Sequence, residues 1–233
     1  GADGMIDKGY RSYQAELAPG VVVDDYILHM DADTDAEDIV AREAQMTQLA
    51  DAIKVSDNGN PIIVMGDTNC RYTRENLETL FIDAINADER FTIQDAWVEK
   101  AWDGVYPVHG SSDLVANDKG GSYAYPQAEI VDKVFYINNT DSDVQLTAQS
   151  YTVATDFVNE SGTALADHWP VVVEFQYEKQ TQECSHEYAA SVTAPTCIQP
   201  GYTTYTCSIC GDTYTADETP ALGHTFGEYQ HSN

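Results

Sequence analysis

Four apolar segments of this chain, each predicted to form a buried strand, have Asp, Asn or His within them or next to one of their ends. The segments are 21–28, 62–65, 130–137 and 171–175. The polar phrases are Leu28-His29-Met30-Asp31-Ala32, Gly66-Asp67-Thr68-Asn69, Ile130-Val131-Asp132-Lys133-Val134 and Ala166-Asp167-His168-Trp169-Pro170. Because polar groups at the ends of neighbouring strands lie together on a rigid sheet, the pattern predicts one shared site. Two His, three Asp and one Asn suit metal-assisted attack of water on a phosphate ester.

The segments between and after these strands predict the fold class. Segments 36–54 and 74–87 carry apolar residues at helical spacing. Segment 102–128 is rich in Gly, Ser and Tyr, which predicts a long surface loop. One further strand is predicted at 144–153, and the last of the four strands is predicted to extend over 171–177. This order of elements predicts an α/β fold with helices packed on the faces of a sheet.

The chain is strongly acidic, with 39 Asp and Glu against 11 Lys and Arg and a formal net charge of −28. Nucleic-acid binding draws most of its affinity from Lys and Arg, so this charge disfavours duplex DNA as a partner. A bound divalent metal would still attract an anionic substrate locally. A solvated extracellular surface is the simpler explanation of the charge. No apolar run reaches the ~20 residues that cross a bilayer, so no transmembrane segment is expected in this piece.

Each polar phrase, taken alone, has a simpler explanation. The Gly-Asp-x-Asn phrase can be only a turn, His29 can be a hydrogen-bonded residue at a strand end, and the Asp-His phrase can be a loop leading into a strand at Pro170. Asp132 is harder to explain, because a carboxylate in a buried strand is costly unless it is paired. Lys133 is a poor partner, since neighbours on a strand point to opposite faces, and we therefore expect a histidine to pair with Asp132.

Together the four phrases resemble the endonuclease/exonuclease/phosphatase superfamily of DNase I-like, metal-dependent phosphohydrolases. Residues 66–69 match its Gly-Asp-x-Asn motif, and 166–170 match its Ser-Asp-His-x-Pro motif with Ala166 in place of Ser. Leu28-His29-Met30 resembles its His-Leu strand, Asp132-Lys133-Val134 its Asp-Tyr-Ile strand, and Arg42-Glu43-Ala44-Gln45 its Arg…Gln helix. The resemblance spans about 8–177. It implies part of a four-layered α/β sandwich of the DNase I-like type.

The resemblance also implies a role for each residue. His168 would be the acid/base group at the scissile phosphate. Asp67 would position or deprotonate the attacking water, and Asn69 would hold a phosphate oxygen. Asp167 would bind a divalent metal, Mg²⁺ or Mn²⁺. His29 would contact the phosphate or act as a second acid/base group.

In the same comparison Asp132 would orient one of the two histidines. The implied reaction is hydrolysis of a phosphodiester or phosphomonoester, with a small or lipid-linked ester favoured over duplex DNA. Family members begin with a half-domain that carries an Asn and a metal-binding Glu, and nothing before Tyr10 matches it. We therefore expect this chain to lack the N-terminal half of the fold and to be inactive alone. The alternative is a non-catalytic extracellular binding or attachment protein that retains the fold.

Cysteine usage divides the chain. Cys70 stands alone in the first 183 residues, where it is expected to be a small buried residue. The other four are Cys184, Cys197, Cys207 and Cys210. We predict a partial endonuclease/exonuclease/phosphatase domain at 1–178, a linker at 179–183 and a small Cys-rich β-type repeat at 184–223. A further copy would start at 224–233, where His224-Thr225-Phe226 repeats His186-Glu187-Tyr188.

Cys207 and Cys210 form a Cys-x-x-Cys-Gly sequence that is typical of a zinc site. Cys184 or His186, together with Cys197, can complete four zinc ligands, and His224 is a further candidate. The four cysteines can instead form two disulfides in a small extracellular module. The repeat resembles Cys- and Thr/Tyr-rich repeats of bacterial surface proteins. That resemblance implies a secreted or cell-surface protein, associated with the surface or wall through the repeat.

Overall fold

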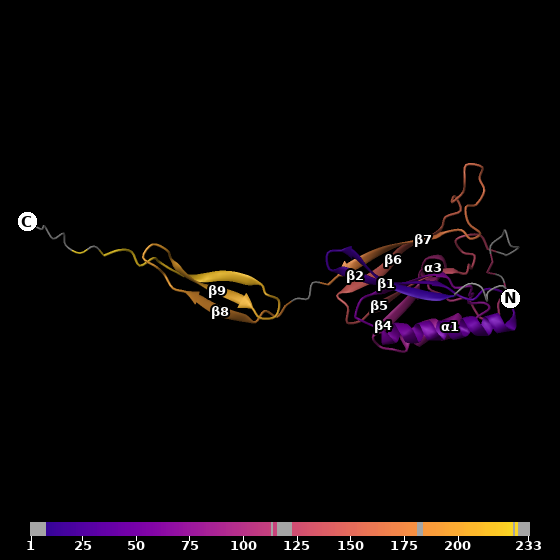
Figure 1. Cartoon of the computed structure of the whole chain (residues 1–233), viewed down its shortest axis with the longest axis horizontal. Coiled ribbons are helices and arrows are strands. Elements are labelled where there is room, and N and C mark those ends of the chain that lie inside the picture. Colours follow the sequence, from indigo (N-terminus) through magenta and orange to yellow (C-terminus); the bar gives the residue numbers. More distant parts are fainter. Residues whose placement is uncertain (1–7, 113, 116–122, 181–183, 226, 228–233) are drawn as a thin grey trace, which may run out of the picture. The chain divides into compact units, whose positions relative to one another are not determined.

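The chain divides into two units, Gly1–Gln180 and Thr181–Asn233, which we call the large unit and the small unit. The computed structural model describes residues 8–112, 114–115, 123–180, 184–225 and 227 (Figure 1). The boundary between the units falls within the segment 179–183 that the sequence analysis named as a linker. Most of the predicted further repeat copy at 224–233 lies outside the described residues.

A five-stranded mixed sheet forms the centre of the large unit, with the strand order β1-β2-β3-β5-β4. Its strands are β1 (Gly9–Ala18), β2 (Val21–His29), β3 (Ile62–Asp67), β4 (Phe91–Asp95) and β5 (Asp132–Asn139). Strands β2 and β3 run parallel, and the other neighbouring pairs are antiparallel. A parallel pair needs a crossover connection, which helix α1 (Ala36–Val55) supplies.

Helix α1 packs along one face of this sheet (Figure 1). It begins at Asp35, whose backbone N–H donates to the Asp38 carboxylate in a capping box. Met46, Leu49 and Ile53 are buried in the main core of the large unit. No helix in the described part of the chain has the length and apolar character that a membrane crossing requires.

The two faces of the sheet carry different layers. Phe135 of β5 contacts Phe81 of η2 (Glu78–Asp83), a π-helix on the α1 side that continues into α2 (Ala84–Asn86). The next residue, Tyr136, contacts Phe175 in the opposite layer. That layer is a two-stranded antiparallel sheet of β6 (Val144–Val153) and β7 (Val171–Lys179), next to helix α3 (Ala96–Ala101). Alternation of side chains along β5 therefore connects both layers to one core.

Most predicted elements are present, and the mixed α/β fold is confirmed. The predicted helix at 74–87 is instead a turn followed by η2 and α2. The strand predicted at 130–137 begins and ends two residues later. Strands β1 and β4 and helix α3 were not predicted. The predicted loop at 102–128 lies partly outside the described residues.

The small unit is a three-stranded antiparallel sheet in the order β10-β9-β8. Its strands are β8 (Tyr188–Thr193), β9 (Gly201–Cys207) and β10 (Thr213–Thr219). Within 184–225 and 227, only Gly201, Thr203 and Cys207 are buried. The described part of this unit therefore has almost no apolar core.

Candidate functional site

Three of the predicted site residues occupy matching positions on three adjacent strands. His29 ends β2 and is opposite Asp67 at the end of β3, and Asp67 is opposite Asp132 at the start of β5. Directly opposite residues in a sheet point to the same face, so these side chains form a row. Nε2 of His29 lies 3.6 Å from Oδ2 of Asp67.

His168, from the loop that precedes β7, contacts the other end of this row. Its Nδ1 lies 2.8 Å from Oδ2 of Asp132 and 3.8 Å from Oδ2 of Asp67. Lys133, the neighbour of Asp132, instead lies 3.6 Å from Glu129 and over the ring of Tyr72. Asp132 therefore pairs with a histidine and not with its neighbour.

Burial is the main reason that the pKa of the Asp132 carboxyl is raised. The nearby charge of Asp67 raises this pKa further, whereas His168 lowers it. His168 and Asp132 thus form a half-buried acid–base pair in which a proton can be shared. Such a pair can orient an imidazole for proton transfer.

The turn after β3 holds Asp67 in place. Gly66 has φ +137°, and a Cβ there would lie 2.1 Å from the carbonyl oxygen of Leu28, so only glycine fits. The backbone N–H of Asn69 donates to Oδ1 of Asp67 at 2.8 Å. The Asn69 side chain donates to the carbonyl of Met30 at 3.1 Å, which ties this turn to the end of β2. Its role at a phosphate oxygen stays a prediction.

A buried ion pair supports the segment that follows His29. Arg42 of α1 is 0% exposed and donates to Glu75, which is 1% exposed, at 2.8 Å. The same guanidinium donates to the carbonyls of Asp31, Ala32 and Asp33. Sequence reasoning noted Arg42 but not Glu75, because the two are 33 positions apart and no local pattern connects them.

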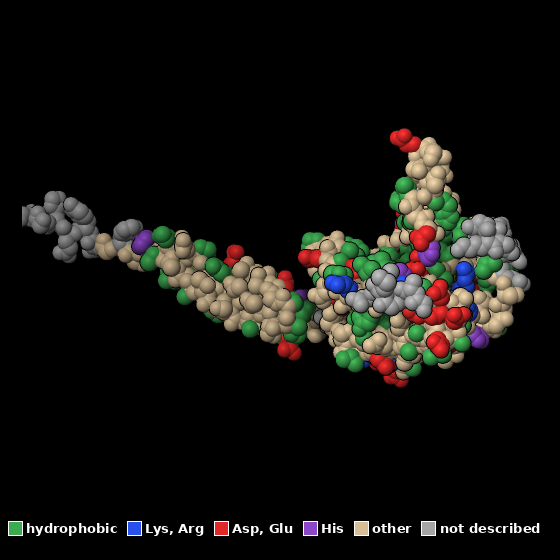
Figure 2. Space-filling view, turned by 45° about the vertical axis from the view of Figure 1, so that its right-hand side comes forward, with side chains coloured by type: hydrophobic (Ala, Val, Ile, Leu, Met, Phe, Trp, Pro, Cys, Tyr) green, Lys and Arg blue, Asp and Glu red, His purple; other side chains and the backbone are tan. Residues whose placement is uncertain are grey.

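A pocket opens beside His168 and Asp132 and is also lined by Asp167, Trp169 and Arg71. Arg71 is the cationic residue of this lining, and sequence reasoning missed it. Burial lowers its pKa, while its guanidinium donates to the carbonyls of Leu114 and Glu129. The sequence signal that could have identified Arg71 is its position two residues after the Gly-Asp-x-Asn phrase. Figure 2 shows acidic side chains and histidines gathered on one face of the large unit, with few Lys or Arg among them.

The donor atoms of Asp67, Asp132 and His168 lie within 4.8 Å of one another. Asp167, which the resemblance assigned to the metal, lines the pocket but does not belong to this group of three in the described part of the chain. Carboxylate oxygens are the ligands that Mg²⁺ and Mn²⁺ prefer, and Mg²⁺ needs only one or two of them beside water and substrate. The donor set therefore fits such an ion.

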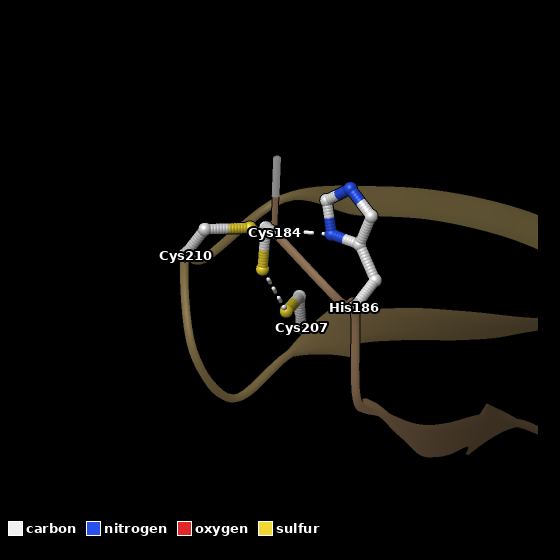
Figure 3. Close-up of side chains that lie close together, drawn as sticks. All are labelled: Cys184, His186, Cys207 and Cys210. Carbon is white, nitrogen blue, oxygen red and sulfur yellow. Dashed lines mark hydrogen bonds between the residues drawn. The ribbon is translucent and has the colours of Figure 1, made fainter. Parts of the chain in front are cut away.

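In the small unit, Cys184, Cys207 and Cys210 come together with His186 and not with Cys197 (Figure 3). Cys197 is exposed in the connection between β8 and β9. Tyr188 pairs with Cys207 at the end of the hairpin that holds the cluster. Thr193 pairs with Tyr202 at the opposite end, from which the connection with Cys197 extends. The length of the hairpin thus separates Cys197 from the other three cysteines. The cysteines are free thiols, and Cys70 is buried.

Comparison with known sequences gives one group of relatives. Over 171 residues, or 73% of this chain, the sequence is 32% identical to a sphingomyelinase from Mycobacterium bovis and to one from Mycobacterium tuberculosis. This part of the chain is homologous to bacterial sphingomyelinases. The chain spans 31% of the length of these relatives. No family model matches the chain.

Solved structures resemble the chain only in part. An endonuclease/exonuclease/phosphatase from Beutenbergia cavernae has a TM-score of 0.46 at 14% identity, covering 85% of this chain and 46% of that one. TDP2 from D. rerio, complexed with a single-stranded DNA product, has a TM-score of 0.47 at 15% identity, with coverages of 71% and 60%. Beta toxin 275-280 from Staphylococcus aureus has a TM-score of 0.42 at 16% identity, with coverages of 75% and 59%.

Proposed function

We propose that the large unit belongs to the endonuclease/exonuclease/phosphatase superfamily and serves hydrolysis of a phosphate ester by activated water. The observation that carries the proposal is the 2.8 Å contact between His168 and Asp132, at the end of the row that also holds Asp67 and His29. These residues come from four segments far apart in the sequence. Homology to sphingomyelinases favours a lipid-linked phosphodiester as the substrate class.

The residues divide the proton transfers between them. Asp132 accepts a hydrogen bond from Nδ1–H of His168, which directs Nε2 of that ring toward the pocket to exchange a proton with a phosphate-ester oxygen. The Asp67 carboxylate accepts a proton from the attacking water and becomes a neutral carboxylic acid, while His29, 3.6 Å away, orients Asp67 or contacts the phosphate. Arg71 supplies positive charge in the same pocket.

A divalent metal, Mg²⁺ or Mn²⁺, would be held by Asp67, one of the three grouped donors, together with Asp167, which lines the adjacent pocket and is the ligand that the sequence resemblance implies. When bound it would stabilise negative charge on the phosphate oxygens. Secretion or display at the cell surface, with attachment through the small unit, belongs to the same proposal and rests on the sequence resemblance of the repeat.

Binding of inorganic phosphate tests the site without depending on turnover. Isothermal titration calorimetry with Mg²⁺ should show binding to the unaltered chain. His168→Ala and Arg71→Met should each weaken it about ten-fold or more, because a charge-assisted hydrogen bond contributes about 1.5–3 kcal/mol.

His109→Gln is the matched control, because His109 contacts the backbone of Glu75 and is not part of the pocket lining. Equal loss of phosphate binding in this control would contradict the proposed site. Turnover of bis-p-nitrophenyl phosphate or sphingomyelin vesicles, where detectable, should fall about 10²- to 10⁴-fold in His168→Ala.

A further inference from the structure

The cluster in the small unit has four potential ligand atoms close together. Sγ of Cys184 and Sγ of Cys207 are 3.5 Å apart, and Sγ of Cys210 lies 3.3 Å from Nδ1 of His186. All four atoms lie within 4.8 Å of one another. In Figure 3 the three sulfur atoms and the imidazole face a common centre.

These separations match a tetrahedral metal centre. With Zn–S of about 2.3 Å and Zn–N of about 2.0–2.1 Å, tetrahedral geometry places two sulfurs about 3.8 Å apart and a sulfur and a nitrogen about 3.5 Å apart. A disulfide would need the two sulfurs at about 2.05 Å. The observed 3.5 Å and 3.3 Å lie close to the zinc values.

The backbone around Cys207 has the form of a metal-binding turn. The N–H of Ile209 points at Sγ of Cys207 at 3.4 Å, and the N–H of Gly211 donates to the carbonyl of Cys207 at 3.0 Å. Gly211 closes the turn with φ +76°, a conformation that favours glycine. Ser208 donates its N–H to the carbonyl of Glu187, which joins the turn to the segment that carries His186.

The histidine is held by its own neighbours. The ring of His186 stacks on Tyr188 with centroids 5.2 Å apart. The hydroxyl of Tyr188 donates to Asp212 at 2.8 Å, directly after the Cys-x-x-Cys-Gly turn. These contacts orient both halves of the cluster, as good metal sites require.

The small unit also needs such a centre. Only three of its described residues are buried, and Cys207 is one of them. Units of this size without an apolar core are usually stabilised by metals or disulfides. Cys197 cannot form a disulfide with the cluster, because β8 alone separates the two ends by roughly 17 Å, against the ~7 Å limit between bonded Cα atoms.

We propose that Cys184, His186, Cys207 and Cys210 bind one Zn²⁺ ion as a Cys₃His site that stabilises the small unit. Binding releases three thiol protons to solvent and takes the imidazole in its neutral form. The site is structural, since all four positions of the tetrahedron are occupied by the protein. Cys197 is not a ligand.

Zinc content of the full 233-residue chain, purified under reducing conditions, is the test. We expect one equivalent of zinc by mass spectrometry, lost in His186→Ala and retained in the matched control Cys197→Ser. His186→Cys should restore binding with four thiolates. Substitution by Co²⁺ should give the intense visible absorption of a tetrahedral ion, with more thiolate charge-transfer intensity in His186→Cys.

Two results would overturn the proposal. One is a reduced, zinc-reconstituted chain that holds no zinc and gives only octahedral Co²⁺ absorption. The other is loss of zinc in Cys197→Ser with retention in His186→Ala, which would assign the fourth position to Cys197. In the first case, a mass lower by two hydrogen atoms per disulfide before reduction would identify the cysteines as cross-linked.

Discussion

At the scale of single residues, Asp132 illustrates how a site is built at a cost in stability. Its carboxyl is held in a half-buried position beside Asp67, and burial raises its pKa. A carboxyl whose pKa is higher in the folded than in the unfolded state binds more protons when folded. Folding stability contributed by this group is therefore present at acidic pH and falls as the pH rises from about 3.8 through the raised pKa.

Asp132→Asn should remove this pH-dependent loss. We expect the difference in unfolding free energy between the variant and the unaltered chain to shift in favour of the variant between pH 4 and pH 7. Urea unfolding at a series of pH values, followed by tryptophan fluorescence, measures it. A difference that is constant with pH, or that moves against the variant, would show that Asp132 is not destabilised by its surroundings.

At the scale of elements, the position of His29 depends on α1. Arg42 on this helix donates to three carbonyls directly after β2 and to the buried carboxylate of Glu75. Arg42→Met leaves Arg74 as the ion-pair partner of buried Glu75 and leaves the three carbonyls without that donor. Loss of one partner of a buried ion pair costs about 3–5 kcal/mol.

Lys54→Met is the matched control on the same helix, because Lys54 pairs with exposed Asp51 and such pairs contribute about 1 kcal/mol or less. Urea unfolding should separate the two variants by at least about 2 kcal/mol, given these contributions. Equal effects would mean that the Arg42 contacts add nothing beyond those of a surface pair.

The elements also show what sequence reasoning can reach. Strands β2, β3, β5, β6 and β7 and helix α1 were predicted because their apolar residues follow the period of the element. Strand β1 was not predicted, because it is an exposed edge strand with little apolar patterning. The π-helix η2 has the same spacing of apolar residues as an ordinary helix, so its hydrogen bonding could not be predicted.

Sequence patterns likewise predicted some residues of the candidate site and not others. His29, Asp67, Asp132 and His168 were proposed from their places at strand ends, and sheet register explains why three of them form a row. Arg71 and Glu75 act through contacts across the fold, which no local pattern reveals. Cys197 was predicted as a zinc ligand, and it lies outside the cluster because spacing alone does not say which end of a hairpin a cysteine occupies.

At the scale of the whole molecule, the two units differ in what stabilises them. The large unit has an extended apolar core that includes Trp97, and the chain's other two tryptophans, Trp102 and Trp169, pack against that core. The small unit has tyrosines around its metal-binding cluster and almost no core among its described residues. Tryptophan fluorescence therefore reports on the large unit alone.

Chelation of zinc under reducing conditions should unfold the small unit only. We expect the near-ultraviolet circular dichroism of tyrosine to lose the part contributed by the small unit, which holds five of the 15 tyrosines. The midpoint of tryptophan-detected unfolding should stay unchanged, because metal binding energy is folding energy for a unit without a core. A chelated chain whose near-ultraviolet tyrosine signal is unchanged would contradict the structural role of the metal.

The most direct test of the proposed phosphate-ester site is a crystal structure of the chain with Mn²⁺ and inorganic phosphate. The account predicts phosphate within hydrogen-bonding distance of His168 and His29, and an anomalous manganese peak beside Asp67 and Asp167. Phosphate bound elsewhere, or His168 lying away from Asp67 and Asp132, would contradict it.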